Sequence, residues 1–399
     1  MKILTPPILK VLALFCVAGL SACADYQVRT TDYTPVEVLQ TEVAFDTLLD
    51  VGIRVFEPEL ENLPDEALEF DGVRQAESIW VADRLKETLD STGAWGYVRV
   101  IPDDLVTIDL IVEGKILQSD GETTRLDLTA TDSSNRVWLD KSYTQVISHY
   151  AYSSEQVGNE PFQGLYNQIA NDLLQLMDQM EPGARRQLRK VTDMRFAAGF
   201  SPEAFSEFLV ADSDGHYQLE RLPADNDPML QRVDDIRLRD QMFVDVLQDY
   251  YRGFVSNMET PYDAWREQSF TETTIIRELD SAADARKLGG WLAIAAGLGA
   301  QFSDDYLVRL AGTSAVYGGV ENIRAGYMAQ DEALLHIQTL SELGESLEYE
   351  LEPSVIELQD RTITLAGTTR DQYDEWRGIL REIYFRETGE IPPAGEDGG

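Results

Sequence analysis

Val51-Gly-Ile-Arg-Val-Phe56 is the most informative segment of this 399-residue chain for its fold, because a strand pattern begins there and a helical pattern follows it. Glu57-Pro58 ends the predicted strand, and a polar loop follows. A helical pattern then runs to a stop near Gly93, with its apolar positions three or four residues apart at Ala76, Ile79, Leu85 and Leu89. The segment therefore predicts a strand and the helix that returns from it.

Further strands are predicted after this helix. Turn signals at Asp120-Gly121 and Ser133-Ser134-Asn135 separate them. The predicted strands are 97–101, 108–112, 124–130 and 136–143. An amphipathic helix between Phe162 and Met180 follows. The order predicts an α+β domain over residues 44–182, built as a mixed sheet with flanking helices.

Four segments carry a family resemblance, and they occur in one order: Val51-Gly-Ile-Arg-Val-Phe56, Ala94-Trp-Gly-Tyr-Val-Arg-Val100, Ile108-Asp-Leu-Ile-Val-Glu-Gly114 and Asp132-Ser-Ser-Asn-Arg-Val-Trp138. In this order they resemble the α/β domain shared by the curli-secretion lipoprotein family, the lipoprotein activator of peptidoglycan synthases and the N-terminal domain of the Tol translocation protein. The resemblance covers about a quarter of the chain and implies a periplasm-facing protein-interaction module.

Two departures limit what the resemblance implies. Arg54 stands where those families usually keep an apolar residue, and the domain contains no pair of long alternating segments that could form pore hairpins. Curli-type secretion is therefore not expected here. The family also offers no catalytic residues to transfer.

The C-terminal half is predicted to be a mainly α-helical domain over 195–348. Ser201-Pro202, Asp227-Pro228 and Thr260-Pro261 each have the composition of a helix start. Val355–Leu358 and Thr362–Gly367, followed by a helix from Asp371, predict a small strand-strand-helix unit over 349–388. Residues 389–399 have the composition of a disordered tail.

A Gly/Ala-rich helical hairpin is expected over 288–320. Leu288–Phe302 contains no charged residue and places small residues four apart at Gly289, Ala293 and Gly297, which lets helix backbones approach closely. Three interpretations stay open: a buried hairpin, a self-association surface and membrane insertion. Fifteen apolar residues are too few to cross a bilayer, which argues against the third interpretation.

A short motif occurs twice, as Tyr262-Asp-Ala-Trp-Arg266 and as Tyr373-Asp-Glu-Trp-Arg377. Tryptophan and arginine dominate interface hot spots, so Trp265, Arg266, Trp376 and Arg377 are candidate partner-docking residues. The alternative is that both copies lie on amphipathic helices whose aromatic side chains belong to the core.

The N-terminal segment is similar to a bacterial lipoprotein signal. Lys2 and Lys10 precede the apolar run 11–20, and Leu20, Ser21, Ala22 and Cys23 then follow in lipobox order. We expect a signal peptide over 1–22, acylation of Cys23 and a tether over 23–43. By resemblance to lipoprotein sorting signals, Ala24 favours the outer membrane, with the protein facing the periplasm.

Composition narrows the function further. The chain has 33 Lys and Arg against 71 Asp and Glu, a net charge of −38, which argues against nucleic-acid or anionic-lipid binding through a basic patch. Both cysteines, Cys16 and Cys23, lie at the N-terminus, so the body offers no disulfide, zinc thiolate or cysteine nucleophile.

No catalytic motif or cofactor fingerprint occurs, and we expect no cofactor. Asp212, Asp214 and Gly215 fit part of a calcium loop, but Val210 and Arg221 occupy its first and twelfth positions, so no metal site is predicted. The sequence favours a non-enzymatic lipoprotein that docks within an envelope complex or export system, with an envelope protein or a second copy as partner. The alternative is an envelope hydrolase that acts on glycan or peptidoglycan through a carboxylate pair.

Overall fold

The computed structural model describes residues 33–39, 43–59, 71–102, 108–153, 159–224, 226–300 and 306–389. The predicted signal peptide, the lipobox with Cys23 and the tail from residue 390 onward lie outside these ranges.

The sheet of the N-terminal domain is mixed, as the sequence predicts. Its order is β2-β1-β3-β4-β5, with β1 parallel to β2 and β3, and with β4 antiparallel to both of its neighbours, β3 and β5. The strands are β1 (Val51–Arg54), β2 (Val98–Ile101), β3 (Leu110–Ser119), β4 (Thr123–Asp132) and β5 (Val137–Val146). Both predicted turns are present, and Asp132 fixes the second by accepting hydrogen bonds from the Ser134 amide (2.8 Å) and the Trp138 indole (2.8 Å).

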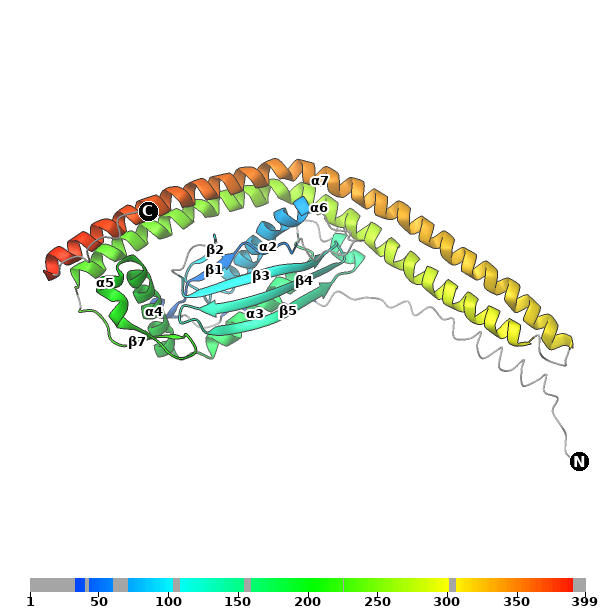
Figure 1. Ribbon diagram of the computed structural model, residues 1–399, viewed down its shortest axis with the longest axis horizontal. Coiled ribbons are helices and arrows are strands. Elements are labelled where there is room, and N and C mark those ends of the chain that lie inside the picture. The colour runs from blue at the N-terminus through cyan, green and yellow to red at the C-terminus, as the bar shows by residue number, and fades with distance from the viewer. Residues whose placement is uncertain are drawn as a thin grey trace, which may run out of the picture.

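Two helices, α2 (Asp71–Ser91) and α3 (Gln163–Asp178), cover one face of the sheet (Figure 1). Alternate residues of β3, among them Leu110, Val112 and Ile116, are fully buried in the same core as the apolar side chains of α2. The intervening residues of β3 are partly or fully exposed except at its last position, as expected of an antiparallel strand with one solvated face.

A smaller second core lies under α4 (Pro182–Phe200) and α5 (Pro202–Phe205). It includes Phe200, Phe205, Met229 and Leu380. The strand pair of the molecule is found here, as β6 (Leu209–Ala211) and β7 (Tyr217–Leu219). The short 3-10 helices are η1 (Phe45–Thr47), η3 (His149–Tyr152) and η4 (Ser206–Phe208). The expected domain boundary at residue 195 falls inside α4.

Two very long helices, α6 (Pro228–Ala300) and α7 (Tyr306–Thr388), form an antiparallel hairpin that arches over the domain and projects beyond it (Figure 1). Asp227 caps α6 as predicted, because its carboxylate accepts hydrogen bonds from the amides of Met229 (2.8 Å) and Leu230 (3.2 Å). With 73 residues in α6, a rise of about 1.5 Å per residue makes it about 110 Å long.

The hairpin corrects two sequence predictions. Residues 349–388 do not form a strand-strand-helix unit, because both predicted strands lie within α7. Four apolar residues of α7 are buried at helical spacing against the main core: Leu347, Leu351, Val355 and Leu358. Their packing overrides the strand preference of the β-branched residues in the two predicted strands. Pro261 does not start a helix either: it lies inside α6, as Pro353 lies inside α7.

Candidate interaction surface

A buried polar joint fastens α6 to the N-terminal domain. Its centre is Glu77 on α2, 1% exposed, which accepts hydrogen bonds from the Tyr262 hydroxyl (2.8 Å) and the Ser119 hydroxyl (2.9 Å). The guanidinium of Arg74 lies 3.6 Å away. Burial raises the pKa of the Glu77 carboxyl, and the neighbouring arginines oppose the rise. The joint therefore holds the hairpin through a buried acid that is hydrogen-bonded from two elements.

Trp265 and Arg266, predicted to dock a partner, lie inside this joint. Arg266 is 3% exposed, its guanidinium is 2.7 Å from the Glu160 carboxylate, and it lies over the Tyr262 ring. Trp265 is 6% exposed and stacks with Tyr262. Their burial corrects the prediction of an exposed docking face. The alternative, core aromatics on an amphipathic helix, describes this copy of the motif, although the Arg266 charge is buried as well.

The turn between β3 and β4 supplies the rest of the joint. Arg277 pairs with Asp120 (2.5 Å) and Glu122, and the Ser269 hydroxyl donates to the Asp120 carbonyl (3.0 Å). Gly121 has φ +80°, and a Cβ there would meet the Arg266 carbonyl oxygen at 2.7 Å. The sequence predicted this turn but gave no sign that α6 lies against it, because that contact joins residues about 150 positions apart.

The second copy of the motif also packs within the chain. Trp376 is partly buried against the smaller core, with the guanidinium of Arg239 over its ring. Arg377 lies over the ring of Phe200 and pairs with Asp374 (3.4 Å). Both residues thus help fasten the far end of α7 to α4 and α6, and both stay partly exposed, so this copy of the motif is only partly used within the chain.

Glycines bring α6 and α7 together in the projecting part of the hairpin, which we call the distal arm (278–300 and 306–335). A Cβ on Gly290 would meet the Gly319 carbonyl oxygen at 2.6 Å, and a Cβ on Gly319 would meet that of Gly290 at the same distance. This close approach supports the hairpin interpretation of the sequence. It uses Gly290, however, rather than the predicted neighbour Gly289.

Of the predicted self-association residues, Gly289 lies away from this seam. A Cβ on Gly289 would meet nothing within 4 Å, and Ala293 is half-buried. The side chains around Gly297 lie outside the described part of the molecule. Gly289 is therefore not part of the contact between α6 and α7.

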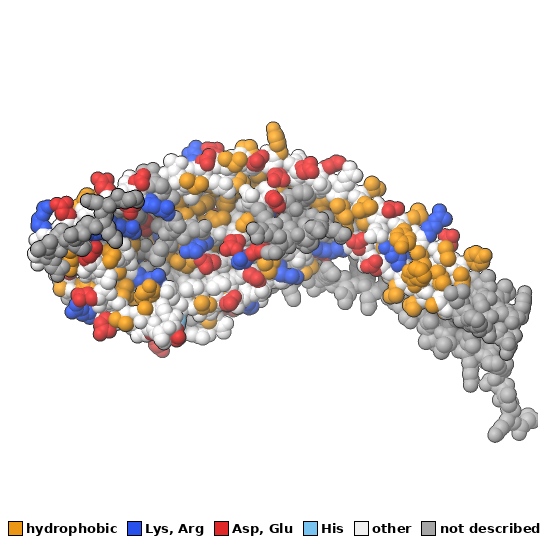
Figure 2. Space-filling model, viewed as in Figure 1, with side chains coloured by type: hydrophobic (Ala, Val, Ile, Leu, Met, Phe, Trp, Pro, Cys, Tyr) orange, Lys and Arg blue, Asp and Glu red, His pale blue; other side chains and the backbone are white. Residues whose placement is uncertain are grey.

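Large apolar side chains are exposed on the distal arm. Figure 2 shows hydrophobic side chains gathered over the arm where it leaves the domain. The exposed apolar residues of the arm include Leu288 (63% exposed), Trp291 (63%), Leu292 (62%), Tyr317 (72%) and Val320 (51%). Residues 288–302 stand out in the sequence because none of them is charged. Which apolar side chains of the arm face outward is set by the contact between α6 and α7, which the sequence does not show.

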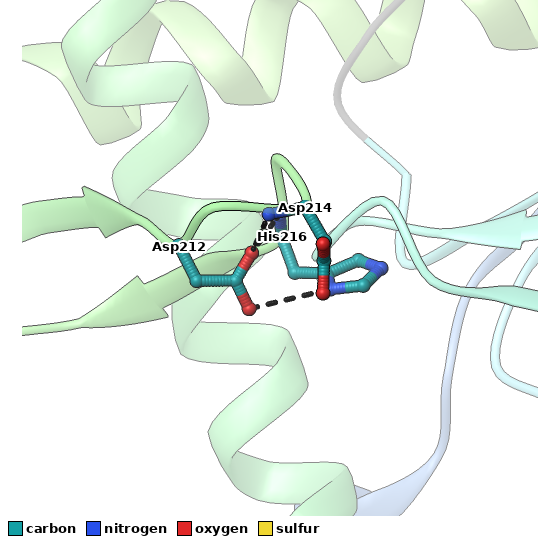
Figure 3. Close-up of side chains that lie close together, drawn as sticks. All are labelled: Asp212, Asp214 and His216. Atoms are coloured by element: carbon teal, nitrogen blue, oxygen red, sulfur yellow. Dashed lines mark hydrogen bonds and ion pairs between the residues drawn. The ribbon is translucent and has the colours of Figure 1, made fainter.

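Asp212, Asp214 and His216 form the one group of possible metal ligands found among the described residues (Figure 3). They lie in the β6–β7 turn, where the Asp212 carboxylate accepts hydrogen bonds from the amides of Asp214 (2.9 Å) and His216 (2.9 Å). These bonds lower the pKa of the Asp212 carboxyl. The arrangement is that of an aspartate stabilising a tight turn.

Carboxylates on the open face of the sheet bear on the hydrolase alternative. A groove there is lined by Glu57, Glu113, Asp127 and Asp140, together with Arg54 and Lys115. Arg54 pairs with Glu113, and Lys115 pairs with Glu57 (2.6 Å). Burial raises the pKa of four carboxyls that lie outside this groove: Glu77, Asp83, Asp109 and Asp234.

Comparisons with known proteins do not place the chain in a family: no family model, curated protein or solved structure matches it. Within the described residues, no helix is both long enough and apolar enough to cross a membrane.

Proposed function

We propose that this chain is a non-enzymatic bacterial lipoprotein, anchored in the outer membrane through acylated Cys23, that works as a docking component of an envelope complex. The domain holds the hairpin, and the distal arm contacts the partner. The single observation that carries the proposal is the exposed apolar face of the arm, because large exposed apolar patches mark protein–protein or membrane interaction sites.

The buried joint supports the proposal that the domain holds the hairpin while the arm contacts the partner. Glu77, Arg266 and Arg277 fix α6 to the domain through side chains of α2, the β3–β4 turn and residue 160. A partly satisfied buried charge is strongly destabilising, so the hairpin cannot leave the domain without a large cost. The arm is therefore held at a fixed angle, which suits a part that positions a partner.

The tether limits where the arm can reach. Tyr33, the first described residue, comes ten positions after Cys23, and an extended chain spans at most about 3.5 Å per position, or about 35 Å. An anchor at Cys23 would keep the domain within that distance of the bilayer. The domain from which the arm projects would then lie in the layer next to the membrane.

The test is in-cell crosslinking of the C-terminally tagged protein, followed by purification and identification of what is attached. The matched control is Cys23→Ser, which removes the lipid acceptor. We expect the unsubstituted protein to stay in the membrane fraction and to capture itself or a defined envelope protein, and the control to leave that fraction. Capture of neither, together with membrane association that survives Cys23→Ser, would contradict the proposal.

A further inference from the structure

Residues 33–39 are held against the domain, although they fall within the tether that the sequence predicts. We call this segment the strap. Asn171 on α3 binds it at two points: its side-chain nitrogen donates to the Pro35 carbonyl (2.9 Å), and its side-chain oxygen accepts from the Glu37 amide (2.7 Å). Because both bonds go to main-chain groups, Asn171 holds the course of the strap rather than any one of its side chains.

Asn167, one helical turn before Asn171, binds the same segment from a buried position. It is 1% exposed, and its side-chain nitrogen donates to the Thr34 carbonyl (2.8 Å). Its side-chain oxygen accepts from the Gln163 amide (2.9 Å), which also donates to the Thr88 hydroxyl of α2 (2.9 Å). The Asn167 amide is therefore oriented by α2 and α3 together. A buried polar group needs a partner, and the strap supplies it to the nitrogen.

The two ends of the strap lie at different levels of the domain. At one end, the Leu39 amide donates to the Thr92 carbonyl (3.0 Å), beyond the last turn of α2, whose first turns hold the joint. At the other end, Asn167 binds the strap in the second turn of α3, and α3 begins beside the joint, where Glu160 pairs with Arg266. The chain therefore enters the domain on the side of the joint, from which the distal arm also projects (Figure 1).

We propose that Asn167 and Asn171 form a clasp that ends the free tether at Tyr33 and so sets how far the domain can move from the membrane. The proposal rests on the proposed function for the anchor at Cys23. Without the clasp, the free chain would continue to the next hold, at Phe45, whose carbonyl accepts a hydrogen bond from α4 (2.9 Å). Phe45 comes 22 positions after Cys23, a span of about 77 Å at about 3.5 Å per position, so the clasp roughly halves the reach.

Hydrogen exchange on the soluble Cys23→Ser form tests whether the clasp is closed. We expect the Glu37 amide to exchange at least about tenfold more slowly than in an unstructured peptide, and Asn171→Ala to remove this protection. Gln175→Ala is the matched control, because Gln175 lines the cavity beside the strap and has no hydrogen bond to the strap within the described residues. Unchanged protection of the Val112 amide in the sheet would show that each variant is folded. An unprotected Glu37 amide in the unsubstituted chain, or equal protection in both variants, would overturn the clasp.

Energy transfer measures the reach in the lipidated protein, bound to phosphatidylcholine vesicles that carry an acceptor dye in the headgroups. The donor dye is attached through Tyr349→Cys, a position that is 81% exposed in the unsubstituted chain. We expect Asn167→Ala with Asn171→Ala to lower the transfer efficiency, because the domain moves further from the bilayer, and Gln175→Ala to leave it unchanged. Equal transfer in both would overturn the proposed reach. A lipid-free protein that does not bind the vesicles at all would refute the proposed anchor, while exchange at Glu37 still decides whether the clasp is closed.

Discussion

At the scale of single residues, the hydrogen bond between Tyr262 and Glu77 is the sharpest test of the joint. The two groups come from α6 and α2, are both buried, and lie 2.8 Å apart. Tyr262→Phe removes the donor and leaves the carboxylate with one hydroxyl fewer, which should lower the free energy of unfolding by about 1–3 kcal/mol. Urea unfolding measures this change. Tyr349→Phe, on the exposed side of α7, should stay within about 0.5 kcal/mol.

The same acid gives the joint a pH dependence. Because burial raises the pKa of Glu77, the folded protein holds its proton to a higher pH than the unfolded chain does. Stability from this group is therefore complete at low pH and is lost as pH rises from the ordinary carboxyl pKa through the raised one. The side chain of the Glu77→Gln variant cannot titrate, so comparison with this variant isolates the pH dependence of stability that comes from Glu77. The stability of the unsubstituted protein minus that of Glu77→Gln should be larger at about pH 5 than at about pH 8, and an equal difference at both would refute the raised pKa.

At the scale of elements, the two adjacent glycines of α6 should respond oppositely to the same substitution. Gly289→Ala adds a Cβ into open space and should stabilise the helix by up to about 1 kcal/mol. Gly290→Ala places a Cβ 2.6 Å from the Gly319 carbonyl and should destabilise the hairpin by about 1–3 kcal/mol. Thermal unfolding followed by circular dichroism compares them. Equal effects of the two variants would mean that the seam does not pass through Gly290.

The elements that the sequence predicts well are those whose signals are local. Residues such as Gly93, Asp120 and Asn135 end α2 or form the turns between strands. Each of them determines the backbone conformation at its own position, so its effect can be predicted from the sequence. The long helices are different. Pro261 and the β-branched run at 362–364 are local signals against a helix, and contacts with distant parts of the chain override them.

At the scale of the whole molecule, the joint could not be predicted from the sequence at all. Trp265 and Arg266 have the composition of an interface hot spot, and they do lie at an interface, but it is the one between α6 and the chain's own domain. Composition identifies residues that bind strongly without identifying their partner. The arm was easier to predict, because a stretch without charge is conspicuous in so acidic a chain.

The net charge makes assembly depend on salt where the partner of the arm is a second copy. Two copies that each carry −38 repel one another, and the repulsion is weakest along the charge-free stretch 288–300 of the arm. Raising the ionic strength screens that repulsion while leaving apolar contact in place, so any dimer of the Cys23→Ser form should strengthen with sodium chloride. Sedimentation velocity at low and high salt measures it. A dimer that weakens with salt would mean that ion pairs, rather than the apolar face, hold it together.

We propose that the distal arm is where this protein contacts its partner. The most direct measurement replaces Trp291, in the lipidated protein in cells, with a photo-crosslinking amino acid, and replaces the exposed Tyr349 in a parallel strain. The account predicts a discrete crosslinked species, either a second copy or one envelope protein, from position 291 and none from position 349. Crosslinks from position 349 alone, or from neither position, would contradict it.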